Sequence, residues 1–76
     1  MSNREEVVSF LHTIARPGAS LDGVADEANL VELGIIDSLS VVQIVMHLET
    51  NYQKSVAGVD MTTLVSVQGI LDVIHS

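Results

Sequence analysis

The residues whose types and order best suit a chemical function are 34–39, which read Gly-Ile-Ile-Asp-Ser-Leu. Asp and Ser are both favoured at the N-terminus of a helix, and a segment rich in apolar residues follows them. As structure alone, the segment is a turn glycine, two core residues and a helix cap. As chemistry, it places the Ser38 hydroxyl in the first turn of a helix, within reach of another protein. A phosphodiester on that hydroxyl would face the positive end of the helix dipole and free backbone N–H groups.

Other candidates for chemistry are weak. The histidines His12, His47 and His75 fall on three different predicted helices, and the chain has no cysteine to complete a metal site. No HExxH, P-loop or GxGxxG pattern occurs. We therefore expect the three histidines to lie on the surface and no metal to be bound, and we predict that the protein is not an enzyme.

Composition narrows the class of partner. The chain has 76 residues, with 10 acidic and 3 basic side chains and a formal net charge of −7. This charge repels phosphate backbones, and aromatic side chains for stacking bases are scarce, so nucleic acid is excluded as a partner. Partners with basic docking surfaces are favoured. The length allows one domain, residues 1–76, which we expect to be a monomer.

The sequence also argues against a membrane protein. Its longest unbroken apolar stretches are two or three residues, such as 44–46, whereas a span needs roughly 18. The first six residues, Met-Ser-Asn-Arg-Glu-Glu, lack the basic region and apolar stretch of a signal peptide. We expect a cytoplasmic protein.

Apolar periodicity predicts an all-α fold. Spacing of i, i+3, i+4 and i+7 predicts a first helix over about residues 3–15 and a last helix that Ser66 caps and that runs to about residue 74. Residues 38–51 are too long without a turn signal for a typical strand, so we predict a second helix there. Residues 60–64 suit one short turn of a third helix. Together these elements predict a small four-helix bundle.

The connection between the first two helices, residues 17–37, has no sustained periodicity. A structureless loop of this length is uncommon in a compact domain unless it is functional. We expect it to cross the surface, with Leu30 and Leu33 inserted into the core as a single helical turn.

With these elements in place, the chain resembles the acyl and peptidyl carrier proteins. These are small acidic four-helix bundles that carry a 4′-phosphopantetheine arm on the serine of an Asp-Ser-Leu motif at the start of the second helix. Residues 37–39 match that motif. The resemblance covers nearly the whole chain and includes Leu30, Leu33-Gly34, Val42, Leu48-Glu49, Tyr52 and Ser66-Val67-Gln68 with Ile70 and Ile74.

The resemblance implies a function for each residue of the motif. Ser38 would accept 4′-phosphopantetheine covalently from coenzyme A, donated by a phosphopantetheinyl transferase. Asp37 would help to place magnesium and the hydroxyl in that transferase, and Leu39 would contact partner proteins. The arm's thiol would hold an acyl or aminoacyl group as a thioester, received from an adenylating or acyl-transferring loading enzyme and passed to a downstream synthase or transferase.

Two departures from fatty-acid carriers bear on pathway and docking. Ile35 and Ile36 are two residues between the glycine and the Asp, where fatty-acid carriers usually have one. This spacing is more similar to that of peptidyl and D-alanyl carriers and free-standing carriers of specialised pathways, so we predict a free-standing carrier of polyketide or nonribosomal type. In addition, Gln43 replaces a usual glutamate and Val41 occupies a commonly polar position.

The second helix therefore has more apolar surface than a fatty-acid carrier. We predict that partners dock there largely through hydrophobic contact. The predicted partner face consists of Leu39, Val41, Val45, Met46 and Glu49. The alternative is that Val45 and Met46 belong to the core, and for Met46 the two interpretations are equally supported.

A different class of function also fits these residues. In an unmodified helical interaction adaptor, Asp37-Ser38 would be only a cap and the second helix a permanent interface. Substituting Ser38 with Ala separates the two: a carrier loses its function, whereas an adaptor loses only roughly 1 kcal/mol of capping.

Overall fold

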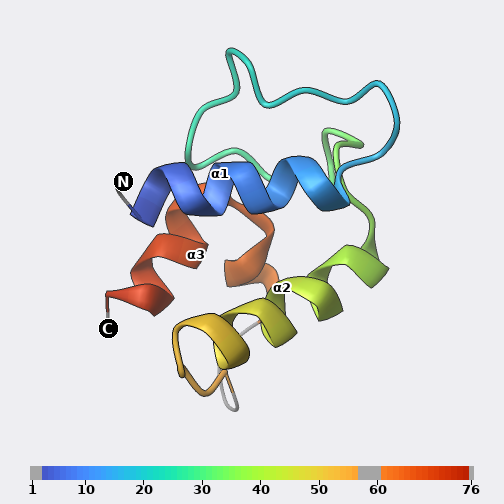
Figure 1. The fold of residues 1–76 in the computed structure, drawn as a ribbon. Coiled ribbons are helices and arrows are strands. Elements are labelled where there is room, and N and C mark those ends of the chain that lie inside the picture. The colour runs from blue at the N-terminus through green and yellow to red at the C-terminus, as the bar shows by residue number, and fades with distance from the viewer. Residues whose placement is uncertain (1–2, 57–60, 76) are drawn as a thin grey trace.

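The computed structural model describes residues 3–56 and 61–75. Its elements are α1 (Asn3–Ile14), α2 (Ser38–Asn51), the 3-10 helix η1 (Met61–Val65) and α3 (Val67–Ile74) (Figure 1). The described residues contain no strand, and the predicted all-α class is confirmed. None of the helices in these residues is long and apolar enough to span a membrane.

The third predicted helix differs from expectation. Residue 60 lies outside the described residues, and the remainder of the predicted segment belongs to η1, which is a 3-10 helix rather than an α-helix. A four-helix bundle is therefore not confirmed. A five-residue element suits the tighter 3-10 geometry, which proteins use in short pieces between other helices.

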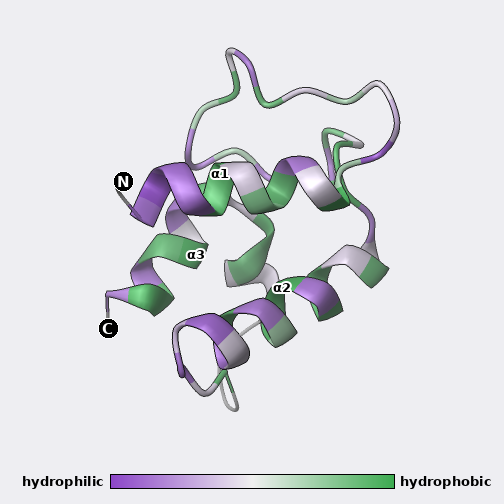
Figure 2. Ribbon diagram, in the orientation of Figure 1, coloured by the Kyte–Doolittle hydropathy of each residue, from purple (hydrophilic) through white to green (hydrophobic). Residues whose placement is uncertain are grey.

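The hydrophobic core lies between α1, α2, η1 and α3. The last helix, α3, is the most embedded, because six of its eight residues are buried, and Figure 2 shows it as apolar along most of its length. As predicted, Ser66 caps α3, and its hydroxyl accepts a hydrogen bond from the backbone N–H of Gly69 at 3.0 Å. The buried apolar residues are Val7, Leu11, Leu30, Ile35, Ile36, Val41, Ile44, Leu48, Val56, Leu64, Val67, Ile70, Leu71, Val73 and Ile74.

Glycine at position 69 lets η1 and α3 approach closely. A Cβ atom on Gly69 would lie 1.7 Å from the carbonyl oxygen of Thr63. Because that neighbour is backbone, it cannot rotate away as a flexible side chain would. The close approach brings η1 against the helix that contributes more buried apolar residues than any other element.

The long loop crosses the surface, as predicted, and arches over α1 in Figure 1. Asp26 holds its middle: the carboxylate accepts two hydrogen bonds from the Arg4 guanidinium, at 2.7 and 3.0 Å, and the carbonyl accepts one from the Gln68 backbone N–H at 2.8 Å. Further along, the Leu30 N–H donates to the carbonyl of Val65 at 2.8 Å. The loop is thereby attached to both ends of the chain.

The end of the loop forms the predicted turn, but one of the predicted core residues, Leu33, lies outside the core. Leu30 is fully buried, whereas Leu33 is 56% exposed, so the prediction that Leu33 enters the core is wrong. Gly34, at φ 75°, closes the turn, and the carbonyl of Leu30 accepts from the N–H groups of Ile35 and Ile36. This reversal turns the two isoleucines inward, as predicted, and leaves Leu33 on the surface.

Candidate functional site

Ser38 is the first residue of α2 and is exposed. The N-cap is Asp37, whose backbone is extended, with φ −115° and ψ −179°. Its carboxylate Oδ1 accepts hydrogen bonds from the backbone N–H of Ser40 at 3.0 Å and from the Ser40 hydroxyl at 3.1 Å. The same N–H also donates to the Asp37 backbone carbonyl at 3.0 Å, so the side chain and the main chain of the cap together fix where α2 begins.

The Asp37 carboxylate is engaged with Ser40 and leaves Ser38 free. Hydrogen bonds, chiefly the one from the Ser40 backbone N–H, hold the pKa of Asp37 below its ordinary value of 3.8, so the group is ionised at neutral pH. Within the described part of the chain, the structure records no hydrogen bond to the Ser38 hydroxyl. That hydroxyl is available at the positive end of the helix dipole.

Two buried residues hold the backbone that leads to Ser38. Ile35 and Ile36 are 6% and 1% exposed, and the carbonyl of Ile35 accepts a hydrogen bond from the Arg16 N–H at 2.8 Å. Residues 37–39, by contrast, are all exposed. The serine therefore lies on a short exposed segment with a rigid, packed base, which is a favourable arrangement for presenting a reactive group.

An apolar hollow of about 330 Å³ borders Ser38. It lies between the end of the long loop, the first turns of α2 and η1, and three of the six residues around it are valines. The residues around it are Asn29, Val31, Ser38, Val41, Thr62 and Val65. A group attached to the Ser38 hydroxyl would have apolar surface within reach.

Three apolar side chains of α2 face outward in a row. Leu39 is 76% exposed, Val42 52% and Met46 61%. Their spacing of i, i+3 and i+7 places them on one face of the helix, and we call them the α2 stripe. Met46 thus lies on the surface, which decides between its two interpretations. Val42 was not among the predicted partner residues, although this same spacing could have identified it.

The other predicted partner residues divide between surface and core. Glu49 is exposed and Val45 is half-buried. Val41 is buried, at 7% exposure, so the prediction that it offers an exposed docking surface is wrong. It lies three residues before buried Ile44, on the inward face of α2, where it packs in the core and borders the hollow.

The three histidines differ in exposure. His12 and His75 are exposed, as expected, but His47 is half-buried and stacks on the ring of Phe10, so the expectation for His47 is wrong. In the residues that the structure describes, no group of three or more His, Cys, Asp or Glu side chains could hold a metal ion.

Comparison with known families identifies the class of protein. A family model described as "Phosphopantetheine attachment site" matches residues 10–74, which is most of the chain. The chain belongs to this family of phosphopantetheine-binding carrier proteins. No curated protein and no solved structure matches it.

Membership fixes the general properties of the site. The family is defined by covalently attached 4′-phosphopantetheine, and its domains are not catalytic but carry substrates on that arm. Carrier proteins of this kind generally interact with a phosphopantetheinyl transferase and with biosynthetic enzymes.

Proposed function

We propose that Ser38 carries the 4′-phosphopantetheine arm. The observation that carries this proposal is an exposed serine in the first turn of α2, directly after the N-cap Asp37, with no hydrogen bond to the described residues. The N-terminal end of the helix favours the phosphodiester, because the dipole and unpaired backbone N–H groups attract negative charge. The neighbouring hollow offers apolar contact to the arm beyond its phosphate.

Attachment exchanges the phosphoanhydride bond of coenzyme A for a phosphodiester bond to Ser38. Ser38 Oγ bonds to the phosphorus of coenzyme A that bears the pantetheine, and the bond from that phosphorus to the departing 3′,5′-adenosine bisphosphate breaks. The hydroxyl proton passes to a base of the transferase. Asp37, which is ionised at neutral pH, helps to place the magnesium ion and the Ser38 hydroxyl in the transferase active site.

The attached arm makes the protein a shuttle for an activated intermediate. Its terminal thiol holds an acyl or aminoacyl group as a thioester, so the protein needs no cysteine of its own. Tethering raises the effective concentration of that group at each partner's active site. The chain takes the group from a loading enzyme and delivers it to a synthase or transferase.

The pathway that we propose is of polyketide, nonribosomal peptide or a related type. Support comes from the two-residue spacing between Gly34 and Asp37. Because both intervening residues, Ile35 and Ile36, are buried, the spacing is built into the core rather than an incidental insertion in a loop. It therefore belongs to the framework that sets the position of Ser38.

Partner enzymes dock on the α2 stripe, with Val45 and Glu49 at its border. The stripe begins at Leu39, next to the modified serine, and its apolar side chains are exposed at 52–76%. A small apolar face of this kind suits weak docking that exchanges rapidly, which a relay between enzymes requires. Val41 takes no part in docking, because it is buried.

Intact mass spectrometry tests the proposal. The protein is incubated with coenzyme A, magnesium and a broad-specificity phosphopantetheinyl transferase, in parallel with Ser38→Ala and Ser9→Ala. Ser9 is an exposed serine within helix α1, which makes Ser9→Ala a matched control. Wild type and Ser9→Ala should each gain the mass of one phosphopantetheine, and Ser38→Ala should gain none.

Two results would contradict this assignment. A gain of mass on Ser38→Ala would place the arm on another residue. No gain on the wild type with several transferases, while circular dichroism shows a folded helical chain, would favour the unmodified adaptor, with the α2 stripe as a permanent interface.

A further inference from the structure

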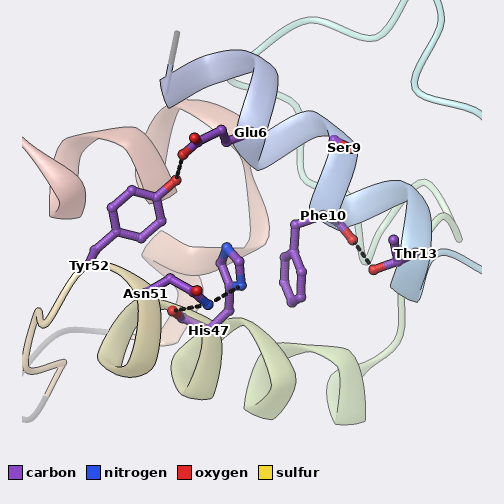
Figure 3. A pocket seen from close by; sticks show the side chains of 7 residues that line it. All are labelled: Glu6, Ser9, Phe10, Thr13, His47, Asn51 and Tyr52. Atoms are coloured by element: carbon purple, nitrogen blue, oxygen red, sulfur yellow. Dashed lines mark hydrogen bonds between the residues drawn. The ribbon is translucent and has the colours of Figure 1, made fainter. Parts of the chain in front are cut away.

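At its C-terminal end, α2 meets α1 through a cluster of aromatic and polar side chains (Figure 3). The cluster surrounds a hollow of about 450 Å³ between the two helices. We call it the ring cluster. Its members are Glu6, Ser9, Phe10 and Thr13 from α1, His47 and Asn51 from α2, and Tyr52 directly after α2.

His47 lies at the centre of the ring cluster. Its imidazole stacks on the ring of Phe10, with centroids 3.9 Å apart and planes 10° from parallel. Tyr52 meets the imidazole edge-on, at 5.8 Å and 70°. The Tyr52 hydroxyl also donates a hydrogen bond to the Glu6 carboxylate at 2.5 Å, which gives the C-terminal end of α2 a second contact with α1.

The side-chain amide of Asn51 determines which nitrogen of the imidazole is protonated. Asn51 Nδ2 lies 3.3 Å from the backbone carbonyl oxygen of His47 and 3.0 Å from His47 Nδ1. A carbonyl oxygen can only accept, so the NH₂ group of the amide must face His47. Nδ1 then accepts from the same NH₂ group, which requires a neutral ring with its proton on Nε2.

The charged and titratable groups around His47 favour the same state. Burial lowers the pKa of His47 below its ordinary value of 6.5, against the opposing effect of the Glu6 carboxylate on α1. Burial and the hydrogen bond to Glu6 raise the pKa of Tyr52 to about 12, so its hydroxyl stays a donor at neutral pH. The other described residues around the hollow do not titrate in this range: Ser9, Phe10, Thr13 and Asn51.

We propose that His47 is a pH-sensitive latch between α1 and α2, closed when its ring is neutral and weakened when the ring is protonated. Protonation of Nδ1 turns an acceptor into a donor that faces the NH₂ group of Asn51, and that hydrogen bond is lost. Rotating the amide would not restore it without cost, because the Asn51 oxygen would then face the His47 carbonyl. Protonation also places a charge in the half-buried stack on Phe10. This latch does not depend on the arm or on Ser38.

The direction of the pH dependence follows from linkage. The unfolded chain binds a proton at His47 near pH 6.5, whereas the folded chain binds it only at lower pH. The stability due to neutral His47 is therefore complete above about pH 6.5 and decreases as the pH falls from there to the folded pKa. Mild acid should loosen the C-terminal end of α2 from α1.

NMR of the full chain tests the latch directly. At neutral pH, ¹⁵N shifts of the His47 ring should show the proton on Nε2 and a bare Nδ1. A pH titration should give a His47 midpoint below 6.5, and Phe10→Leu and Asn51→Ala should each move that midpoint upward. In parallel, the urea concentration at the unfolding midpoint of the wild type should decrease when the pH is lowered from neutral to about 5. This window spans the ordinary histidine pKa.

Two substitutions separate the latch from a purely structural role. His47→Gln cannot be protonated, so it should lose less of its urea midpoint over the same window than the wild type. His12→Gln, which removes an exposed histidine outside the ring cluster, should retain the wild-type loss. A neutral ring protonated on Nδ1, a His47 midpoint at or above 6.5, or an undiminished loss in His47→Gln would each overturn the proposal. The first two are read on the wild type, so they stand even if a variant fails to fold.

Discussion

The two ends of α2 are attached to the rest of the molecule in different ways. At the N-terminal end, buried Ile35 and Ile36 and the Asp37 cap fix the backbone, while residues 37–39 remain exposed. At the C-terminal end, the side chains of His47 and Tyr52 themselves make the contacts, reaching across to α1. The first arrangement holds the chain and leaves its side chains free, whereas the second uses the side chains to hold the chain.

Because of this difference, one end of α2 presents Ser38 to solvent and the other end attaches the helix to α1. Aliphatic burial before Asp37 is insensitive to pH and sets the position of the α2 N-terminus, so Ser38 can be modified without loss of a core contact. The ring cluster depends on a neutral imidazole and on hydrogen-bond geometry, so it responds to protonation. One helix therefore has a pH-insensitive end at Ser38, the proposed site of the arm, and a pH-sensitive end against α1.

The largest expected effect comes from adjacent valines on opposite faces of α2. Val41→Glu places a carboxylate in the core, beside a hollow whose described lining residues include no cation, and should destabilise the protein by about 3–5 kcal/mol. Urea unfolding measures the loss. The neighbouring variant Val42→Glu is the control, since Val42 is 52% exposed. Equal stability of the two variants would contradict the division of α2 into an inward and an outward face.

The elements that local chemistry determines could be predicted from the sequence. The start of α2 at Asp37-Ser38 and the Ser66 cap of α3 were both predicted correctly, because a cap depends on a side chain and amides only two or three residues away. The apolar positions of α1 and α3 followed from helical periodicity for the same reason. The candidate site is at one of these local signals, which is why Ser38 could be proposed from the sequence before the fold was known.

The features that the sequence did not reveal depend on contacts between distant segments. Exposure of Leu33 follows from the reversal at Gly34, which turns the next two residues into the core. Val41 is buried because η1 and the loop end cover that face of α2. His47 pairs with Phe10, which lies 37 positions earlier, on another helix. No spacing within α2 carries that information.

An intermediate effect is expected from acid at the N-terminal end of α2. The pKa of Asp37 is lowered by its hydrogen bonds, so the ionised cap stabilises the fold above about pH 3.8, and this contribution is lost as the pH falls through the folded pKa. Asp37→Ala should lower the urea midpoint at neutral pH. Asp37→Asn, which keeps a capping oxygen, should match the wild type there but lose less on acidification.

Comparing Asp37→Asn with the wild type isolates this cap from other carboxylates. Asp26 contributes in the same range, because its hydrogen bonds to Arg4 lower its pKa, but it is unchanged in both proteins. The acid window of Asp37 also lies below that of His47, so the two ends of α2 should lose stability in separate steps. Identical acid profiles for wild type and Asp37→Asn would show that the cap does not depend on ionisation.

The smallest effect on stability is expected for substitutions in the α2 stripe. The same substitutions should have a large effect on transfer of the thioester to partner enzymes. Val42→Glu should change the free energy of unfolding by no more than about 0.5 kcal/mol, because Val42 already faces solvent. It should nevertheless slow transfer of the thioester by a partner enzyme, since a charge would interrupt the apolar contact. Ala25→Glu, an equal change of charge at an exposed position in the loop, is the matched control and should leave transfer unchanged. Equal rates for the two loaded variants would mean that partners reach Ser38 without the stripe, and that presentation at this end of α2 rests on the exposed segment 37–39 alone.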